Sequence, residues 1–265
     1  MISSLIKFNL DLVKIILFKL KGHKTGFQKD KFFSLEEIKD TQTYDNSNLI
    51  KYIFNKARKA RKAGFYEQDS IIFNKPRPNK LFIDFLLYDY LEKIQFNKKI
   101  KILDYGGSFG NTFFSLENYL NLKFDWNVFD QKKKIQLAKK TKVFKPVNFI
   151  YKHEIKKNYY YDAVLFSTSL QYMEDPLLVL KELRNTSKII LINNLILSDT
   201  KKNYLRIERP DPTIYNYTYP CWFLSKANFL NSLKNYYKIT LNKTDEPYSL
   251  NVRENYYNLK LIKKR

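Results

Sequence analysis

An acidic residue followed by several glycines stands near the middle of the chain, at the end of a short apolar segment. The segment 101–105 contains Asp104 and leads directly into Gly106, Gly107 and Gly110. Glycine has no Cβ atom and adopts backbone conformations closed to other residues, so a glycine-rich turn lets a ligand approach the main chain closely. A carboxylate beside such a turn suits a ligand that carries a positive charge.

The spacing of these glycines excludes two common nucleotide-binding turns. A dinucleotide fingerprint that starts at Gly106 needs glycine at two positions where the chain has Ser108 and Asn111, and the register from Gly107 also fails. No Lys-Ser or Lys-Thr pair follows the turn, which excludes a P-loop. S-adenosylmethionine fits better, because its ammonium group suits the acid and its carboxylate can meet the N–H groups that open the next helix.

A second acid follows twenty residues beyond Gly110. Asp130 ends the apolar segment 126–129, and Gln131 comes next. A carboxylate at this place in a parallel sheet can accept hydrogen bonds from both hydroxyls of a ribose. We therefore predict that Asp104, the three glycines, Asp130 and Gln131 bind the cofactor. The competing interpretation is a tight turn next to a solvent-facing aspartate.

The pattern around these residues predicts the elements that position them. Apolar segments too continuous for a half-solvated sheet alternate with helical segments, which indicates a parallel sheet covered on both faces. Asp175 followed by Pro176 predicts the start of one of these helices. The fold class is therefore α/β, with a doubly wound, mostly parallel sheet. Strands are expected at 100–105, 125–130, 147–151, 162–167 and 188–197, and helices from about 110 and 132.

Residues 1–95 are expected to form a helical extension and lid, and residues 96–265 the α/β domain. A helix at 2–20 has one apolar face, which either packs on the protein's own core or lies on the inner membrane surface. Its charges exclude a membrane span and a secretory signal. Ser34 and Glu37 have the spacing of a capping box for a short helix. Further helices are expected at 48–63, with Gly64 as its stop, and at 79–95.

Composition limits the classes of partner. The hydrophobic share of 44% excludes a disordered chain. With one cysteine and two histidines, an internal disulfide and an ordinary structural zinc site are both excluded, and a reducing cytoplasm is expected. The net charge of +22 is typical of proteins that bind nucleic acid or anionic membranes. Because 40 of the 48 basic residues are lysine, and residues of A/T-rich codons abound, we favour mutational bias as its source.

Taken in order, these motifs resemble those of class I S-adenosylmethionine-dependent methyltransferases. The segment 161–176 is similar to their fourth strand and following helix, which implies that Ser167 faces the cofactor. More narrowly, the chain is similar to a family of methyltransferases found in bacterial surface-polysaccharide gene clusters. That similarity spans residues 32 to about 245 and rests on YEQDSIIF (66–73), LQY (170–172) and YPCWFLS (219–225).

The resemblance implies a Rossmann-like sheet of seven strands, S-adenosylmethionine as cofactor and a small-molecule or glycan acceptor. The chain departs from the pattern at two positions. Ser108 stands where the methyltransferase turn often has glycine, and Gln68 stands where the narrower family has arginine. The second departure removes a side chain that could have held an anionic substrate.

Substrate-binding residues are expected on both sides of the sheet. Arg209 and Tyr217 lie in the segment 206–223, rich in aromatic residues, which we expect to be a functional lid or a packed loop. Glu67 and Asp69 precede the sheet, as parts of a lid or as acids at a helix terminus.

A general base is harder to identify from the sequence. The acidic or imidazole candidates near strand ends are His153 and Glu154 after the third strand, and Glu208 and Asp211 after the fifth. Of these, His153 is the candidate base, with a surface histidine and a neighbour of the adenine as the alternatives.

Three functions fit the sequence. The first is a methyltransferase that acts on a sugar or glycan precursor in surface-polysaccharide biosynthesis, in the cytoplasm and with a possible attachment to the inner membrane face through residues 2–20. The second is an RNA methyltransferase, which the +22 charge supports. The third is a non-catalytic protein that keeps the fold. Fold and cofactor leave the acceptor open.

Overall fold

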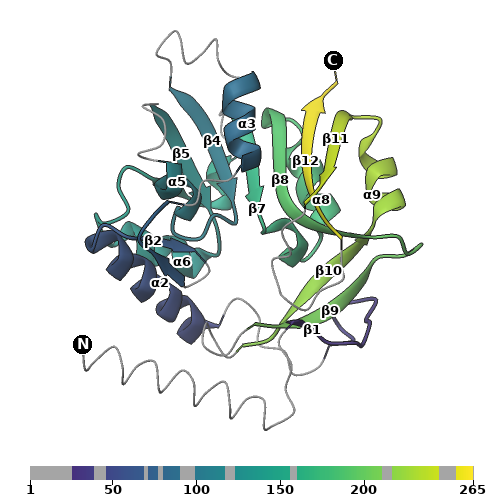
Figure 1. Ribbon diagram of the computed structural model, residues 1–265, viewed down its shortest axis with the longest axis horizontal. Helices are drawn as coiled ribbons and strands as arrows, with labels where there is room; N and C mark the ends of the chain where they lie inside the picture. The colour runs from purple at the N-terminus through teal and green to yellow at the C-terminus, as the bar shows by residue number, and fades with distance from the viewer. Residues whose placement is uncertain are drawn as a thin grey trace.

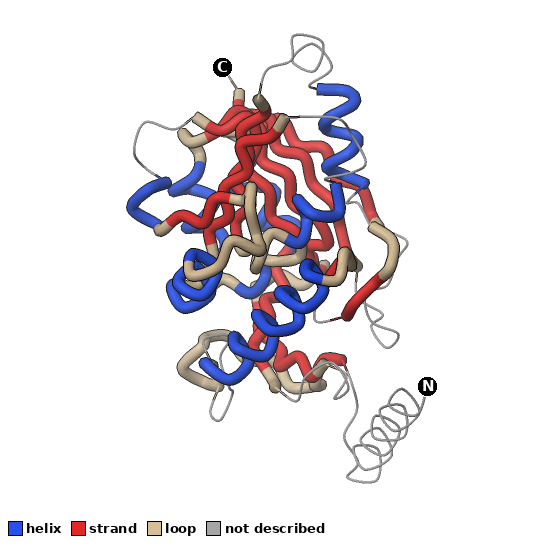
Figure 2. The backbone as a smooth tube through the Cα atoms, turned by 90° about the vertical axis from the view of Figure 1, so that its left-hand side faces the viewer, coloured by secondary structure: helices blue, strands red, loops and turns tan. Residues whose placement is uncertain are grey.

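The computed structural model describes residues 26–38, 46–68, 71–76, 80–89, 99–116, 123–155, 160–210, 217–244 and 255–264. Its strands form one twisted sheet of ten strands and a separate pair, β2 (Tyr66–Gln68) and β3 (Ile71–Phe73). Helices lie on both faces of the large sheet (Figure 1, Figure 2). This arrangement confirms the predicted α/β class.

Five parallel strands make the centre of the sheet. β4 (Ile100–Tyr105) pairs with β5 (Phe124–Phe129) on one side and with β7 (Tyr161–Ser167) on the other. β6 (Asn148–Ile150) continues the sheet beyond β5, and β8 (Ser187–Ser198) continues it beyond β7. The direction of winding therefore reverses at β4, and the carboxyl ends of such strands are where ligands bind in doubly wound sheets. All five strands lie where the sequence predicts them.

Two antiparallel strands complete the seven-stranded unit that the resemblance implies. β12 (Tyr256–Lys263) lies between β8 and β11 (Tyr237–Lys243) and is antiparallel to both. The sheet is thus mostly parallel, as predicted.

Three further strands, here called the extension, continue from the far end of β8. There β8 pairs parallel with β10 (Tyr219–Ser225), which pairs antiparallel with β9 (Tyr204–Arg209), and β9 pairs with β1 (Gly26–Phe27). The prediction of a loop at 206–223 is therefore wrong for residues 206–209 and 219–223, which are strands, while residues 211–216 lie outside the described part of the chain. Buried and half-buried side chains alternate over much of β9 and β10, as expected of antiparallel strands that cover a core on one face.

The helix α2 (Ser47–Lys62) confirms the predicted helix at 48–63. The side chain of Asn46 caps its first turn by accepting a hydrogen bond from the N–H of Asn48, 2.9 Å away. Gly64 has φ +73°, the left-handed conformation that ends many helices. The buried face of α2 packs in the same apolar cluster as β4 and β5, so this part of the N-terminal segment contacts the sheet domain directly.

The remaining helices follow the strands in alternation. The side chain of Asp175 accepts a hydrogen bond from Leu178 N at 2.9 Å, and Pro176 opens the helix, as predicted. The helices are α3 (Lys80–Asp89), α5 (Asn111–Leu116), α6 (Lys132–Lys139), α7 (Lys152–Ile155), the 3-10 turn η1 (Leu170–Tyr172), α8 (Pro176–Leu183) and α9 (Lys226–Leu233).

One predicted helix is absent, and another lies outside the described residues. Residues 33–37 form bends and a turn, in which Glu37 accepts a hydrogen bond from the N–H of Phe33. Two backbone hydrogen bonds between Phe32 and Leu205 hold this segment against β9, which explains why no capping box forms. The helix expected at 2–20 is not described. Among the described helices, none is long and apolar enough to cross a membrane.

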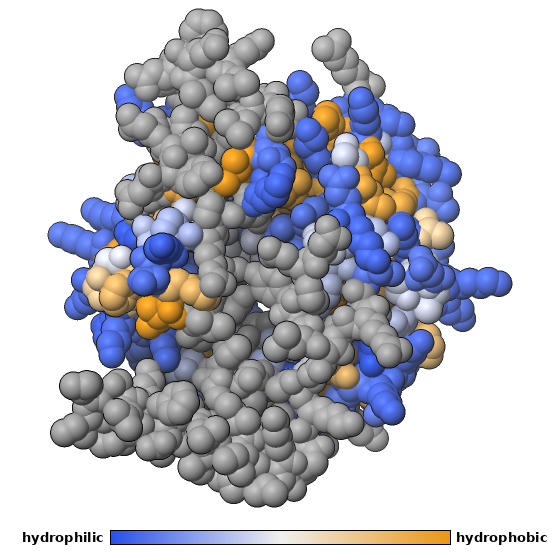
Figure 3. Space-filling model, in the orientation of Figure 1, coloured by the Kyte–Doolittle hydropathy of each residue, from blue (hydrophilic) through white to orange (hydrophobic). Residues whose placement is uncertain are grey.

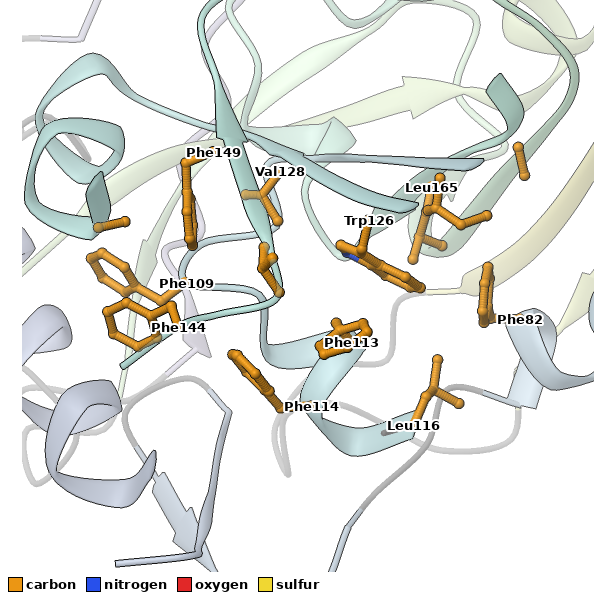
Figure 4. Close-up of a cluster of buried hydrophobic side chains, with 14 of the residues drawn as sticks. Phe82, Phe109, Phe113, Phe114, Leu116, Trp126, Val128, Phe144, Phe149 and Leu165 are labelled. Carbon is orange, nitrogen blue, oxygen red and sulfur yellow. The ribbon is translucent and has the colours of Figure 1, made fainter. Parts of the chain in front are cut away.

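Large aromatic side chains fill the space between the sheet and α2, α3 and α5. Phe109 and Phe144 are stacked with ring centroids 5.3 Å apart, and Trp126 lies edge-on to Phe82 and Phe113 (Figure 4). A second apolar cluster packs α8 and α9 against the other face. On the face of the molecule in Figure 3, hydrophilic side chains cover most of the described surface.

Candidate functional site

The turn of residues 106–110, here called the glycine turn, follows β4 and needs its glycines for steric reasons. Gly106 has φ +79° and donates its N–H to the carbonyl of Phe129, 2.7 Å away. A Cβ atom on Gly106 would lie 2.6 Å from Cβ of Ser169, closer than such atoms approach. Gly110 also has a positive φ, +85°. The turn therefore lies tightly against the segment that follows β7.

Asp104, the last residue but one of β4, is 0% exposed. Its Oδ2 accepts a hydrogen bond from the indole N–H of Trp126 at 3.2 Å, and its Oδ1 accepts none from any residue that the structure describes. A Cβ atom on Gly107 would lie 2.4 Å from Cγ of Asp104, so the carboxyl group packs directly under the glycine turn. Burial raises the pKa of Asp104 to about 7; the Trp126 hydrogen bond opposes this shift, and the negative charge of Asp130 adds to it.

Asp130, at the end of β5, lies on the same side of the sheet and is bonded on several sides. It accepts hydrogen bonds from the N–H of Ser108 at 2.8 Å and from the N–H of Gln131 at 2.7 Å. The ammonium group of Lys134, itself buried, lies 3.0 Å from Oδ1. Asp130 thus ties the glycine turn to α6. The predicted closeness of the two acids and the turn is present, while the predicted contact with a ribose stays a prediction.

Strained backbone gathers at this edge of the sheet. Of the described residues other than glycine, those with positive φ are Ser108 at 51°, Thr168 at 56° and Asn194 at 54°. They follow β4, follow β7 and interrupt β8, three strands that lie side by side. Such conformations cost energy in residues with a Cβ, most of all in a β-branched residue like threonine, and they cluster at functional sites.

The other predicted cofactor residues lie at the same edge. Ser167 ends β7 and is half-buried. Gln131 is the N-cap of α6, and its Oε1 is buried and accepts no hydrogen bond from any described residue. With the carboxyl oxygen of Asp104, two buried acceptors at the edge lack a donor from the described part of the chain. Buried polar atoms of this kind call for a ligand or water.

The structure adds residues that sequence reasoning missed. Gln171 is 1% exposed; its amide donates to the carbonyl of Asn194 at 3.2 Å, and its Oε1 is another buried acceptor with no described donor. The hydroxyl of Tyr172 donates to the carboxylate of Glu208 on β9, 2.6 Å away. Gln171 and Tyr172 belong to the LQY motif, which was the signal available in the sequence. Only the fold shows that Tyr172 meets Glu208.

The predicted substrate residues are spread over two sides of this edge. Glu67, on β2, is 5% exposed and lines a small cavity with Arg61 and Asn111. Arg209 ends β9 in the extension, opposite Gly26. Tyr217 is half-buried against the apolar cluster that contains α2 and β4, and Asp69 lies outside the described residues.

His153 is not brought to the glycine turn by any described contact. It is exposed on α7, after the edge strand β6, with its ring stacked parallel to that of Tyr151 at 5.8 Å between centroids. Its proposed role as a base therefore has no structural contact in its support.

Comparisons with known proteins agree on the fold. No family model and no curated protein matches this chain. The N-terminal domain of EvdMO1, solved in the presence of SAH and D-fucose, matches with a TM-score of 0.50 and 14% identity over 86% of this chain and 100% of that one. The same domain with SAH bound matches with a TM-score of 0.50 and 13% identity over the same shares.

The plantazolicin methyltransferase BpumL in complex with SAH also matches, with a TM-score of 0.47 and 16% identity over 84% of this chain and 92% of that one. At these identities, structural likeness establishes the fold alone. The fold that the EvdMO1 domain and the strand order support is that of class I methyltransferases, a Rossmann-like, mostly parallel sheet flanked by helices.

Proposed function

We propose that this protein is an S-adenosylmethionine-dependent methyltransferase. The observation that carries the proposal is the glycine turn packed on the buried carboxyl group of Asp104, with Asp130 at the end of the neighbouring strand. This group lies where the winding of the sheet reverses, which is where doubly wound folds bind ligands. Two carboxyl groups beside a backbone without side chains suit a cofactor that has an ammonium group and a ribose.

The donor set fits this cofactor. Asp104 offers a carboxyl oxygen and Gln131 an amide oxygen, both buried and both without a donor among the described residues. An ammonium group and hydroxyl groups are the donors that such oxygens accept. The residues that we expect to hold the cofactor are Asp104, Gly106, Gly107, Gly110, Asp130, Gln131 and Ser167.

S-adenosylmethionine, when bound, supplies a methyl group attached to a positively charged sulfur, and the thioether that remains after transfer is a good leaving group. The protein's own task is then to align an acceptor and to exclude water. Asp130 contributes by fixing the glycine turn through the N–H of Ser108, and Lys134 balances its charge. For a hydroxyl acceptor, a nearby group must also take up a proton. We propose Glu208 on β9 for this role, because a half-buried carboxylate can accept a proton and Glu208 already accepts a hydrogen bond from the hydroxyl of Tyr172.

A sugar or glycan precursor is the acceptor that we propose. The similarity of the sequence to methyltransferases of surface-polysaccharide clusters supports this, and so does the presence of D-fucose with a domain of the same fold. Arg209 in the extension, Tyr217 beside the apolar cluster of α2 and β4, and Glu67 on β2 remain our candidates, together with Asp69, which lies outside the described residues. An arginine and an aromatic ring are suited to a phosphate or carboxylate and to the face of a sugar.

Calorimetric titration of the full chain tests the cofactor. We expect heat with both S-adenosylmethionine and SAH, and a loss of affinity of about tenfold or more in Asp130→Asn, since a charged hydrogen-bonding partner is removed. Asp199→Asn, which changes an exposed aspartate after β8, is the matched control and should bind as the wild type does. A folded wild-type protein that gives no heat with either compound would overturn the proposal.

Transfer of a labelled methyl group from S-adenosylmethionine to a panel of nucleotide sugars and free hexoses tests the acceptor. We expect labelled product from at least one sugar. Labelling of RNA alone, with no sugar in the panel labelled, would replace the glycan proposal with the nucleic-acid alternative.

A further inference from the structure

The surroundings of Asp104 leave its carboxyl group with one polar contact among the described residues. On either side in the sheet, Asp104 pairs with Val128 and Leu165, both apolar and both 0% exposed. The backbone of the glycine turn covers it from above at Gly107. The single contact is the hydrogen bond from the indole of Trp126, on the neighbouring strand β5.

The charged groups near Asp104 do not favour its ionisation. Asp130, at the end of β5, is itself negative and raises the pKa of Asp104. The cation on the facing helix α6, Lys134, is paired with Asp130, 3.0 Å away. No described cation forms an ion pair with Asp104. Apart from the N–H of Trp126, a carboxylate buried in such a place is stabilised only by a ligand that enters the site, because isolated charges are costly in an apolar interior.

Trp126 is fixed in the position from which it makes this contact. Its ring is 1% exposed and lies edge-on to Phe82 and Phe113 (Figure 4). Phe124 packs on it in the same manner, and the three centroid separations lie between 5.2 and 5.6 Å. A large aromatic side chain packed on three others has little freedom to turn. Its N–H therefore points at Asp104 whether or not a ligand is present.

We propose that Trp126 is a positioning residue of the cofactor site, which holds the carboxyl group of Asp104 under the glycine turn, and that cofactor binding releases one proton from Asp104. This rests on the proposed function. The ammonium group of S-adenosylmethionine favours the ionised carboxylate, and the proton that Asp104 loses passes to the buffer. No bond other than O–H is broken.

The sign of the pH dependence follows from linkage. In the empty protein the pKa of Asp104 is raised to about 7, and a nearby cation lowers it in the complex. Below the raised value, binding must displace a proton and is therefore weaker. The affinity for S-adenosylmethionine should rise by up to tenfold per pH unit as pH increases toward about 7, and level off above it. The useful range ends at about pH 7.5, because an α-amino group loses its own proton at about 7.7–8.0.

Titration calorimetry of the full chain with S-adenosylmethionine, in two buffers of different ionisation enthalpy, counts the released protons. At about pH 6.5, roughly three quarters of the Asp104 carboxyl groups carry a proton in the empty protein, so we expect the wild type to release about three quarters of a proton per cofactor bound. Asp104→Asn keeps the shape of the side chain and cannot ionise, so its affinity should be low and independent of pH, with no proton released. Release of a proton by Asp104→Asn equal to that of the wild type would overturn the proposal.

Trp126→Phe keeps an aromatic ring and removes the N–H. The expected result is an upward shift of the pH midpoint of binding, so that affinity at about pH 7 falls several-fold while it continues to rise at the highest pH measured. The matched control is Trp222→Phe in the extension, whose indole also donates at 3.2 Å, to the carbonyl of Glu174. This variant should keep the wild-type midpoint. An equal loss of affinity at every pH in Trp126→Phe would reduce Trp126 to a structural role.

The two proposals fail in different ways. Binding of S-adenosylmethionine with a flat pH profile and no proton exchange in the wild type would remove this inference and leave the methyltransferase proposal standing. Absence of binding at every pH, by a protein that thermal unfolding shows to be folded, would remove both. Should Trp126→Phe not fold, the proton count of the wild type and of Asp104→Asn still decides the role of Asp104.

Discussion

The glycine turn and the extension each hold a carboxylate against an aromatic side chain, and the two pairs are built differently. Asp104 is 0% exposed, and the Trp126 hydrogen bond at 3.2 Å is its one polar contact in the described chain. Glu208 is half-buried and receives the hydroxyl of Tyr172 at a much shorter 2.6 Å. The first pair leaves a buried acceptor open for a ligand, whereas the second joins two elements. In our proposal, cofactor binding belongs to the first region and acceptor contacts belong to the second.

The two regions also differ in how the chain assembles them. The cofactor side draws mainly on one stretch, from Asp104 through the glycine turn to Lys134, with Ser167 added from β7. The extension brings together residues far apart in sequence, since Gly26 faces Arg209 and Phe32 bonds to Leu205. A site made of residues close together in sequence can therefore be predicted from their spacing, whereas a site made by strands that are distant in sequence cannot.

The largest effect that would test this contrast is the stability of Asp104→Asn as a function of pH. The pKa of Asp104 is about 7 in the folded protein and about 3.9 in an unfolded chain, so the native state holds the proton more tightly. The wild type should lose stability as pH rises from about 4 to about 7, by up to about 4 kcal/mol. Asp104→Asn should not, and should be the more stable protein at about pH 8.

Urea unfolding across this pH range measures the effect, with Glu174→Gln as the control for an exposed carboxylate. If the free energy of unfolding changed with pH in the same way in the wild type and in Asp104→Asn, burial of the ionised Asp104 would not destabilise the protein. The contrast between Asp104 and Glu208 would then disappear.

Gly107→Ala tests the same region through packing. Its new methyl group would lie 2.4 Å from Cγ of Asp104, and relief of that overlap must move either the turn or the carboxyl group. We expect a loss of about 3 kcal/mol in the free energy of unfolding and of at least about 100-fold in affinity for S-adenosylmethionine. Calorimetry and urea unfolding measure the two quantities separately.

Gly64→Ala is the control, because a methyl group added to Gly64 would have no described atom within 4 Å. Unlike Gly107, Gly64 has a positive φ, +73°. The variant should cost about 1 kcal/mol through backbone strain and leave cofactor affinity unchanged. If both variants behaved alike, a general cost of adding a methyl group to a turn, rather than contact with Asp104, would explain the need for glycine at 107.

The features that could be predicted from the sequence are those that depend on residues close together in the chain. The apolar run ending at Asp104 predicts β4 at its observed bounds, because a strand buried on both faces is continuously apolar. Asp175 and Pro176 predict the start of α8 because capping depends on neighbouring residues alone. The spacing of Asp104, the glycines and Asp130 places all of them at one edge once the strands are parallel.

The rest depended on contacts between distant segments. The aromatic-rich segment at 206–223 suggested a loop because its partner strands, β1 and the end of β8, could not be paired with it by pattern. The short helix expected at Ser34 failed for the same reason, since Phe32 is held by Leu205 across more than 170 positions of the chain. His153 suits a base by residue type, but its place after the edge strand β6 depends on strand order.

Tyr172→Phe tests the region of the extension. Loss of a hydrogen bond to a carboxylate should cost about 2 kcal/mol in the free energy of unfolding, because Glu208 keeps its burial without that donor. Cofactor affinity should stay within about twofold of the wild type, since the extension is not expected to contact the cofactor. Urea unfolding and calorimetry again measure the two quantities.

Tyr236→Phe, which removes the hydroxyl of an exposed tyrosine after α9, is the control for loss of a tyrosine hydroxyl in general. A cofactor affinity that fell tenfold or more in Tyr172→Phe would mean that the extension contributes to cofactor binding, and the two regions would then form a single site.

The smallest expected effect comes from Ser108, which lies in the glycine turn between Asp104 and Asp130 in the sequence. It has φ 51°, a conformation that costs a residue with a Cβ about 1 kcal/mol, and its N–H donates to Asp130 at 2.8 Å. Ser108→Gly removes the strain and keeps the N–H, so the protein should gain up to about 1 kcal/mol with cofactor affinity unchanged. A gain in stability accompanied by weaker binding would instead mean that the serine side chain, and not only its backbone, contributes to the cofactor site.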